Sequence, residues 1–332
     1  MNDGSIEEGG AVVRVKTDLE LPNPALRDWP ALRIQHSPHP MVGDLYKVWP
    51  LLDFQSAIED HLQGVTHIVR GKDLMDSTRK QTLLYNHFGW KYPEPLYWGR
   101  VKVHEFGGFS TSGMKADIAD GKFEGWDDSR LPTISALKRR GFEPQAIRDF
   151  WLDLGLTQKD ISISMQTIES FNSSEIDSDC ERRTFVRNPR NLSLNMGGIE
   201  HPDRLQIARH PHGEIEGVRE WTISEEFVIE DRDYSEKLRL KDFADVSIME
   251  NQAKVSCLQR SDKRTIVHWL PINQSRMARL TTPLGTEFRI DEGLIENIDL
   301  FEGEILQLER VGFAKIEKVP EKGPVELLFL HG

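Results

Sequence analysis

The sequence predicts a multi-domain protein in which an α/β unit and a helical segment precede a region of β-barrels. Its 332 residues exceed what one small core organises, which indicates two or three domains. Helix and strand patterns alternate between residues 53 and 103, as in α/β units. Past Phe185 the helix signals stop and short β-prone runs take over, as in barrels.

The composition is that of an ordinary globular protein. Hydrophobic residues make up 38% and charged residues 29%, and no stretch approaches the roughly 18 uninterrupted apolar residues that a membrane span needs. The acidic amino terminus lacks the pattern of an export signal. Cys180 and Cys257 are the only cysteines, so neither a disulfide framework nor a four-thiolate zinc site is expected. We therefore expect a cytoplasmic protein without zinc, and two loop histidines, His210 and His212, are too few to hold a metal.

The net charge of −12 argues against indiscriminate binding to phosphate backbones. Any contact with RNA must therefore be local. Short runs of lysine and arginine are more often solvated faces than binding sites. The candidate patches are Lys138-Arg139-Arg140, Arg182-Arg183 with Arg187 and Arg190, and Arg260 with Lys263-Arg264.

The first elements are extended segments followed by a helix. Prolines and aromatic residues between Ala11 and Leu52 break any long helix. From Asp53 apolar residues recur at helical spacing up to Leu62, and Gly64 suits the left-handed turn that ends a helix.

A strand, a second helix and a further strand come next. Residues 65–70 are β-rich, Thr78-x-x-Gln81 has the form of a capping box for a helix ending at Gly89, and residues 97–103 restore strand character. Ligands of α/β units lie at the carboxyl ends of parallel strands. The turn of residues 70–73 is so placed.

Residues 126–175 read as helical. One helix ends at Gly141, and Pro144 begins another whose apolar face runs to Leu154, before Gly155. Beyond them, β-prone runs at 265–270, 305–308 and 325–330 alternate with Pro-Leu-Gly-Thr and Glu-Lys-Gly-Pro turns.

Three segments, 48–54 (VWPLLDF), 64–73 (GVTHIVRGKD) and 125–133 (GWDDSRLPT), occur in the order found in class I glutamyl- and glutaminyl-tRNA synthetases, which the chain resembles. The likeness extends through residues 134–141, 210–219 and from 313 to the end. VRVK at 13–16 and NPALRDWP at 23–30 are similar to the archaeal glutamyl branch. The β-rich tail also fits that branch.

The resemblance implies four regions. Residues 1–46 would be the remnant of an acceptor-end-binding insertion, and 47–125 the second half of a Rossmann-type nucleotide-binding catalytic domain. Residues 126–184 would form a helical subdomain that contacts the tRNA stem. Residues 185–332 would form the anticodon-binding region, a proximal β-barrel interrupted by a distal one.

The resemblance also gives roles to residues. Residues 109–115 occupy the place of the family's KMSKS loop, whose cations stabilise departing pyrophosphate, although Gly108 and Thr111 replace its two lysines. The predicted catalytic residues are Ser110, Ser112 and Lys115, and the predicted ATP-binding residues are Arg70, Gly71, Lys72, Asp73 and Thr111, with ATP carrying Mg²⁺. Leu52, Asp53 and His67 are expected at the amino-acid and tRNA-end pocket, where leucine replaces the family's tyrosine and His67 is more readily a packed strand residue than a base.

For tRNA we predict contacts from the helical subdomain and the barrels. The aromatic residues Trp221, Phe227, Trp269 and Phe288 are of the type that stacks on splayed bases, although most aromatic residues in barrels belong to the core. The predicted tRNA-binding residues are Arg130, Lys138, Arg139, Arg140, Arg187, Arg190 and Arg289.

The family's first half carries an HxGH signature that these residues lack. The leading hypothesis is therefore a truncated or split glutamate–tRNA ligase that is inactive alone, with a separate amino-terminal catalytic half as a candidate partner. The complete form would be a monomer that acts on glutamate and glutamate tRNA, with glutamine tRNA as a further candidate substrate. A non-catalytic tRNA-binding module or gene fragment is the alternative, and a glutaminyl enzyme is a third.

Overall fold

The computed structural model describes residues 4–212 and 215–332. The first three residues of the predicted amino-terminal region, and residues 213 and 214 of the stretch 210–219, lie outside the described residues. The chain forms two compact units, Met1–Lys102 with Leu154–Ser162, and Val103–Asp153 with Ile163–Gly332.

The first unit begins with a small sheet that packs on two helices. Strands β1, β2 and β3 are antiparallel and lie in that order. Ala31 of β2 and Trp29, just before that strand, form one cluster with Ala57, Leu84 and Tyr85 of the helices. Residues 12–50 therefore share a core with the helices, and the compact unit does not divide at the predicted border of 46 and 47. The elements are β1 (Val12–Arg14), β2 (Pro30–Ile34), β3 (Val48–Pro50), α1 (Leu52–Leu62) and α2 (Met75–Phe88).

Both helices end at the predicted glycines, but the start of α2 was predicted wrongly. Gly64 and Gly89 have φ angles of 69° and 67°, a conformation that glycine adopts without strain. Helix α2 begins at Met75 after Leu74, which makes no side-chain cap bond. Thr78 and Gln81 lie inside the helix and are buried. Their side chains form hydrogen bonds with Arg70 and Ser56 of other elements and do not cap the helix end.

The predicted α/β unit is confirmed. Strand β4 (His67–Gly71) pairs in parallel with β5 (Glu94–Trp98), with α2 as the crossover between them. The predicted strand at 97–103 is in fact broken after Trp98, and β6 (Val101–Val103) pairs with β7 (Ile161–Ile163).

The second unit opens with four helices, of which α4 and α5 match the predicted ones. Gly141 ends α4 with a φ of 109°. The helices are α3 (Thr111–Ala119), α4 (Ile134–Arg140), α5 (Pro144–Leu154) and α6 (Met165–Ile176). Short 3₁₀ helices across both units span Pro24–Leu26, Lys72–Leu74, His104–Phe106, Asp177–Asp179, Asp231–Asp233 and Ile272–Gln274.

The rest of this unit is two nearly closed barrel-like sheets, as predicted. The distal sheet has the order β17-β14-β15-β16-β10-β13-β18, and the ribbon β11–β12 lies beside it. Its two edge strands are separated only by His268, so one bent strand brings the edges together. The strands are β10 (Pro189–Asn195), β11 (Arg204–Ala208), β12 (Val218–Thr222), β13 (Glu226–Glu230), β14 (Lys237–Leu240), β15 (Asp245–Met249), β16 (Gln252–Cys257), β17 (Thr265–Val267) and β18 (Trp269–Pro271).

The proximal sheet is closed in the same way. Its order is β8-β21-β22-β23-β19-β20-β9, and only Thr184 separates the edge strands β8 and β9. The distal sheet is inserted between β9 and β19. The strands are β8 (Arg182–Arg183), β9 (Phe185–Arg187), β19 (Ser275–Leu284), β20 (Glu287–Glu296), β21 (Ile305–Leu308), β22 (Gly312–Lys318) and β23 (Val325–His331).

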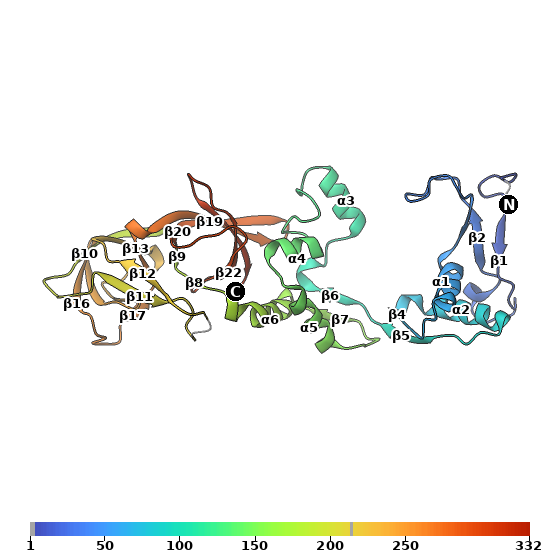
Figure 1. Ribbon diagram of the computed structural model, residues 1–332, viewed down its shortest axis with the longest axis horizontal. Helices are drawn as coiled ribbons and strands as arrows, with labels where there is room; N and C mark the ends of the chain where they lie inside the picture. Colours follow the sequence, from blue (N-terminus) through green and yellow to red (C-terminus); the bar gives the residue numbers. More distant parts are fainter. Residues whose placement is uncertain (1–3, 213–214) are drawn as a thin grey trace. The chain divides into compact units, whose positions relative to one another are not determined.

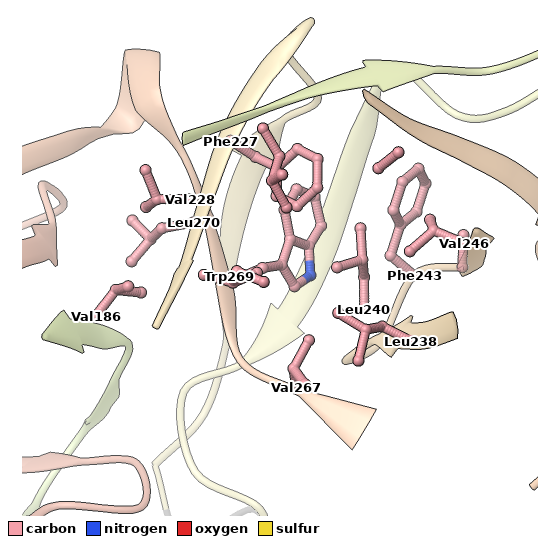
Figure 2. Packing of buried hydrophobic residues seen from close by; sticks show 14 of the residues in the cluster. Val186, Phe227, Val228, Leu238, Leu240, Phe243, Val246, Val267, Trp269 and Leu270 are labelled. Carbon is pink, nitrogen blue, oxygen red and sulfur yellow. The ribbon is translucent and has the colours of Figure 1, made fainter. Parts of the chain in front are cut away.

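The distal core is built around Trp269 (Figure 2). Its indole meets Phe227 edge-on at 5.6 Å and stacks on Phe243 at 5.3 Å between ring centroids. Val186 of β9 belongs to the same cluster, so the two barrels share apolar packing. Across residues 4–212 and 215–332, no helix has the length and apolar character needed to cross a membrane.

Candidate functional site

The turn of residues 70–73 lies where the sequence predicted it. Gly71 is the last residue of β4, and Lys72 begins the short helix that leads into α2. Because β4 and β5 are parallel, this turn is at the carboxyl end of the pair, where α/β units place ligands. A Cβ atom at Gly71 would overlap the Asp73 carboxylate, so glycine allows that carboxylate to fold back over the turn.

Arg70 points into the first unit. Its Nη1 donates to Thr78 Oγ1 at 3.3 Å and to Gln81 Oε1 at 3.0 Å. Gln81 in turn donates to Ser56 Oγ at 2.8 Å and accepts from the Tyr92 hydroxyl at 2.6 Å. Burial raises the pKa of that phenol. Arg70 therefore fixes the strand to α1 and α2, and the groups left at the turn for a ligand are its amides, Lys72 and Asp73.

Lys72 is balanced by an acid from a distant part of the chain. Its Nζ lies 3.0 Å from Asp160 Oδ1, and both side chains are partly exposed. The Arg100 amide and then Lys72 lower the pKa of Asp160, which keeps it ionised. Asp73 is exposed. A phosphate at this turn would compete with Asp160 for the lysine.

The residues predicted for the amino-acid and tRNA-end pocket lie in two different places. Leu52 and Asp53 lie at the first turn of α1, where Asp53 pairs with Lys80 at 2.8 Å and its carbonyl accepts from Gln81 at 3.2 Å. His67 begins β4, at the end opposite to Gly71, and contacts Thr66 and the exposed Glu94. Asp53 therefore lies beside the hydrogen bonds between Arg70 and Gln81, whereas His67 lies at the other end of β4.

The predicted KMSKS-like loop is a helix start. Ser110 is the N-cap of α3 and accepts from the Gly113 amide at 3.1 Å. Thr111, Ser112 and Lys115 lie in the first two turns and are exposed, and no acidic residue occupies the first turn. Helix amino termini favour anions through their free amides and dipole. These residues belong to the second unit, and the turn of residues 70–73 belongs to the first.

The basic run of α4 is largely occupied by internal contacts. Arg139 pairs with Glu317 at 2.9 Å and Glu124 at 3.1 Å. Arg140 is buried, donates to the Leu330 carbonyl oxygen, and has a pKa lowered by desolvation. Lys138 is the exposed cation of the three.

The barrel arginines are paired but remain accessible to different degrees. Arg187 pairs with Glu230 at 3.2 Å. Arg190 pairs with Asp231 at 3.1 Å and lies 3.8 Å over the Tyr234 ring. Arg289, next to the hairpin turn, is exposed and pairs with Asp291 at 3.1 Å.

The prediction that barrel aromatic residues stack on bases is wrong for three of them. Trp221, Phe227 and Trp269 are almost completely buried, and they form the distal core. Phe288 is partly exposed, but its ring carries the Arg130 guanidinium at 4.5 Å.

Sequence reasoning missed a basic hollow beside the barrels. Arg239 and Lys241, two positions apart, line it together with Arg182 and Arg219. The alternation of basic and apolar residues along 237–241 was the signal for this surface.

Glu309, which also lines this hollow, contacts the residue at which each barrel closes, Thr184 and His268. Its carboxylate accepts from Thr184 at 3.4 Å, lies 3.2 Å from His268 Nδ1 and pairs with Lys241. Burial acts against ionisation, but the bonds from His268 and Lys241 hold its pKa at about 2. Thr184 and His268 are the residues at which the two closing strands bend, so one carboxylate contacts both bends.

Within the described ranges 4–212 and 215–332, no group of three or more His, Cys, Asp or Glu residues is placed to hold a metal ion. A magnesium ion that arrives with ATP needs fewer protein ligands, because the phosphates and water supply most of its coordination.

Known proteins match this chain along nearly its whole length. Residues 1–178 match "tRNA synthetases class I (E and Q), catalytic domain", and residues 180–261 match the "anti-codon binding domain" of the same class. A "Glutamate--tRNA ligase" of Archaeoglobus fulgidus is 40% identical over 97% of this chain, and one of Methanothrix thermoacetophila is 42% identical over 100%. The chain spans 58% and 59% of the lengths of these two relatives.

One solved structure is also similar, a glutamate tRNA ligase from Elizabethkingia meningosepticum in complex with its amino acid. It is 20% identical and covers 47% of this chain and 34% of its own, with a TM-score of 0.31. That likeness is too low to support an argument.

Proposed function

Because the chain belongs to the class I tRNA synthetases of the glutamate and glutamine type, we propose that it performs the corresponding part of the work of a glutamate–tRNA ligase. Such an enzyme joins glutamate to ATP as an adenylate and passes the glutamyl group to a tRNA. The observation that carries the proposal is the 40–42% identity to archaeal ligases over nearly every residue of the chain. The cytoplasm is the expected location, and a monomer the expected state.

The turn of residues 70–73 is proposed to contact ATP. Its amides, Lys72 and the folded-back Asp73 would meet the ribose and phosphates, and Arg70 would act indirectly by holding the strand to α1 and α2. Asp53 is proposed for the amino-acid and tRNA-end pocket with Leu52, because it lies beside the same bonds. His67 is retained only as a strand residue at the edge of this region.

The start of α3 is proposed to stabilise the departing pyrophosphate. Attack of the glutamate carboxylate on the α-phosphorus breaks the bond to the β-phosphate bridging oxygen, so negative charge grows on the leaving group. Lys115, the hydroxyls of Ser110, Thr111 and Ser112, and the free amides of α3 are the groups available to offset it. One lysine in place of two predicts weaker stabilisation than in relatives with both.

The barrels and α4 are proposed to grip the tRNA. Lys138 and Arg289 are exposed cations, Arg187 of the proximal sheet and Arg190 of the distal sheet pair with acids of the distal barrel, and the hollow with Arg239 and Lys241 offers further positive charge. In a protein of net charge −12, such local patches are where phosphate contacts would concentrate.

The test is charging of tRNA with radiolabelled glutamate, by the chain alone and with an amino-terminal half from a related archaeal enzyme. We expect charging in the mixture, and a Lys115→Ala variant should lower kcat by about 100-fold, the loss typical of one charge-stabilising group. Lys322→Ala, which removes an exposed lysine outside the proposed site, should leave kcat unchanged.

Other outcomes would favour other functions. Absence of charging in both reactions, with tRNA binding retained, would favour a non-catalytic tRNA-binding module, which the missing lysines of the 109–115 segment make the second candidate. Charging with labelled glutamine instead of glutamate would identify a glutaminyl enzyme, and charging of both tRNAs with glutamate would show broad tRNA selection.

A further inference from the structure

Arg130 is held between two aromatic rings that come from distant parts of the second unit. Its guanidinium carbon lies 4.7 Å from the centroid of Phe123 and 4.5 Å from that of Phe288. Phe123 precedes the segment of Arg130 itself, and Phe288 is the second residue of β20. A cation over an aromatic face is attracted more strongly when it is shielded from water, and the Arg130 side chain is 14% exposed.

All three nitrogens of this guanidinium are also occupied. Nε and Nη2 donate to the Asp128 carboxylate at 2.9 Å and 2.6 Å, and Nη2 also donates to the Lys122 carbonyl. Nη1 donates to the carbonyl of Thr286, in the β19–β20 turn, at 3.0 Å. Asp128 is buried, yet its bonds from Arg130 and the Glu124 amide lower its pKa. Four of the five N–H donors of this guanidinium are thus engaged within the chain, which favours an internal role for Arg130 over the predicted contact with tRNA.

Helix α3 depends on this cluster for its position. None of its residues is buried, and only Met114 and Ile118 pack inward, against Phe123, Leu131 and Ala136. The Phe123 ring therefore touches α3 through its small core and Arg130 through its π face. Weak support of this kind makes the helix sensitive to a single neighbouring contact.

The hairpin that reaches Arg130 is anchored deep in the barrels. Strand β20 pairs with β19 along its whole length, but with β9 only at Gly293–Ile295, opposite residues 185–187. The end near Phe288 extends beyond the barrel towards α4, as Figure 1 shows for β19 and β20. At the other end, Glu296 is fully buried and accepts from Arg219 and from Trp221 Nε1 at 2.8 Å, both on the β12 ribbon. From Phe288 to Glu296 an extended strand spans roughly 26 Å.

We propose that Arg130 is a positioning residue, which fixes helix α3, and with it Ser110, Ser112 and Lys115, to the end of the β19–β20 hairpin. The importance of those three residues rests on the proposed function, but the contact itself does not. Phe288 is the hairpin's side of this contact. Removal of its ring takes away one of the two aromatic contacts of the guanidinium and loosens Arg130, then Phe123, then the helix.

The test is amide hydrogen exchange of the whole chain without RNA. Phe288→Ala is preferred to Arg130→Ala, because loss of the arginine would strand the buried Asp128 carboxylate and risk unfolding. We expect the amides of residues 114–119 to exchange about tenfold faster in Phe288→Ala, with the amides of β21–β23 unchanged. Phe288→Tyr, which keeps the ring, should restore the wild-type rate.

The matched control is Ile290→Ala, which removes another exposed apolar side chain from the same strand without touching Arg130. It should leave the exchange of α3 unchanged. Equal exchange of α3 in the wild type, Phe288→Ala and Ile290→Ala would overturn the proposal. So would acceleration that Phe288→Tyr fails to reverse.

A second readout separates this proposal from the proposed function. In the charging mixture, Phe288→Ala should lower kcat about tenfold, whereas Ile290→Ala, which also lies next to Arg289 on β20, should leave kcat unchanged. An unchanged kcat would refute a positioning role in the reaction. If no variant charges tRNA, the glutamate–tRNA ligase assignment fails, while the RNA-free exchange still decides whether Arg130 positions α3.

Discussion

Single buried polar residues tie together segments of the second unit that are distant in sequence. His331, in the last strand, is 1% exposed and contacts two residues of α6, with Asn172 at 2.9 Å from Nε2 and Ser173 at 3.3 Å from Nδ1. Desolvation, with the nearby Arg140 cation, lowers the pKa of His331 to about 4. The imidazole is therefore neutral in the folded protein at pH values where the unfolded chain already binds a proton.

This difference predicts acid-sensitive stability. The contribution of His331 is fully present above its unfolded pKa of 6.5 and is lost as the pH falls through 6.5 towards 4. Between pH 7 and pH 5 we expect the free energy of unfolding of the second unit to fall by about 2 kcal/mol through this group. Urea unfolding at the two pH values measures it. His331→Gln should remove most of the difference, and His104→Gln, at an exposed histidine, should retain it; an equal pH effect in all three proteins would contradict the assignment.

The candidate site was predictable where its contacts are local and unpredictable where they are not. The Asp128–Arg130 pair joins residues two positions apart, but the bond from Arg130 to Thr286 spans 156 positions. Arg130 was therefore predicted as an RNA contact, because no residue near it in sequence indicated its partner Thr286. The same applies to Arg140, whose partner Leu330 lies 190 positions away.

At the scale of elements, the ends of helices were predicted better than their starts. Gly64, Gly89 and Gly141 end their helices because the left-handed conformation is a local property of glycine. The capping box at Thr78 failed because both of its polar residues bond to other elements, and long-range bonds outweigh a local motif. The KMSKS-like loop became the start of α3 because Ser110 is a good N-cap.

The closure of the proximal barrel depends on a glycine in an ordinary extended conformation. Gly293 faces Arg187 in the pairing of β20 with β9, and a Cβ atom there would overlap the Val186 carbonyl oxygen and crowd the Phe185 ring. Gly293→Ala should therefore push β9 away and lower the free energy of unfolding of the second unit by about 2 kcal/mol.

Thermal or urea unfolding checks this value, with Gly108→Ala as the control. A Cβ atom at Gly108 meets nothing within 4 Å, so that variant should match the wild type. Equal stability of the two variants would show that β9 and β20 do not pair as closely as described.

At the scale of the molecule, the fold class was predictable from periodicity, but the assignment of residues to compact units was not. Residues 154–162 join the first unit although a helix of the second precedes them. The barrel orders also depend on pairings such as β8 with β21 that have no local signal. Period and turn residues predict strands, and only the folded chain selects their neighbours.

Each unit has its own apolar core, which predicts two unfolding transitions. The cluster around Trp29 and Tyr85 lies wholly in the first unit and is small, whereas the clusters around Trp269 and Leu327 lie in the second. Calorimetry should show a lower transition for the first unit and a higher one for the second. Trp29→Ala should destabilise the first unit by about 3–5 kcal/mol and shift only the lower transition. A single transition that shifts as a whole would contradict this division.

The insertion of one barrel into the other also orders events on the ribosome. Strands β8 and β9 are synthesised early, but their partners β21 and β20 come only after the whole distal sheet. Synthesis is slow compared with the formation of local structure, so the distal barrel can fold while β8 and β9 are still unpaired. During that interval Val186 can already join the distal core, because all the other fully buried members of that cluster, residues 192–270, have been synthesised. The nascent distal barrel thus acts as a template that holds β9 in place until the last part of the chain arrives to close the proximal barrel around it.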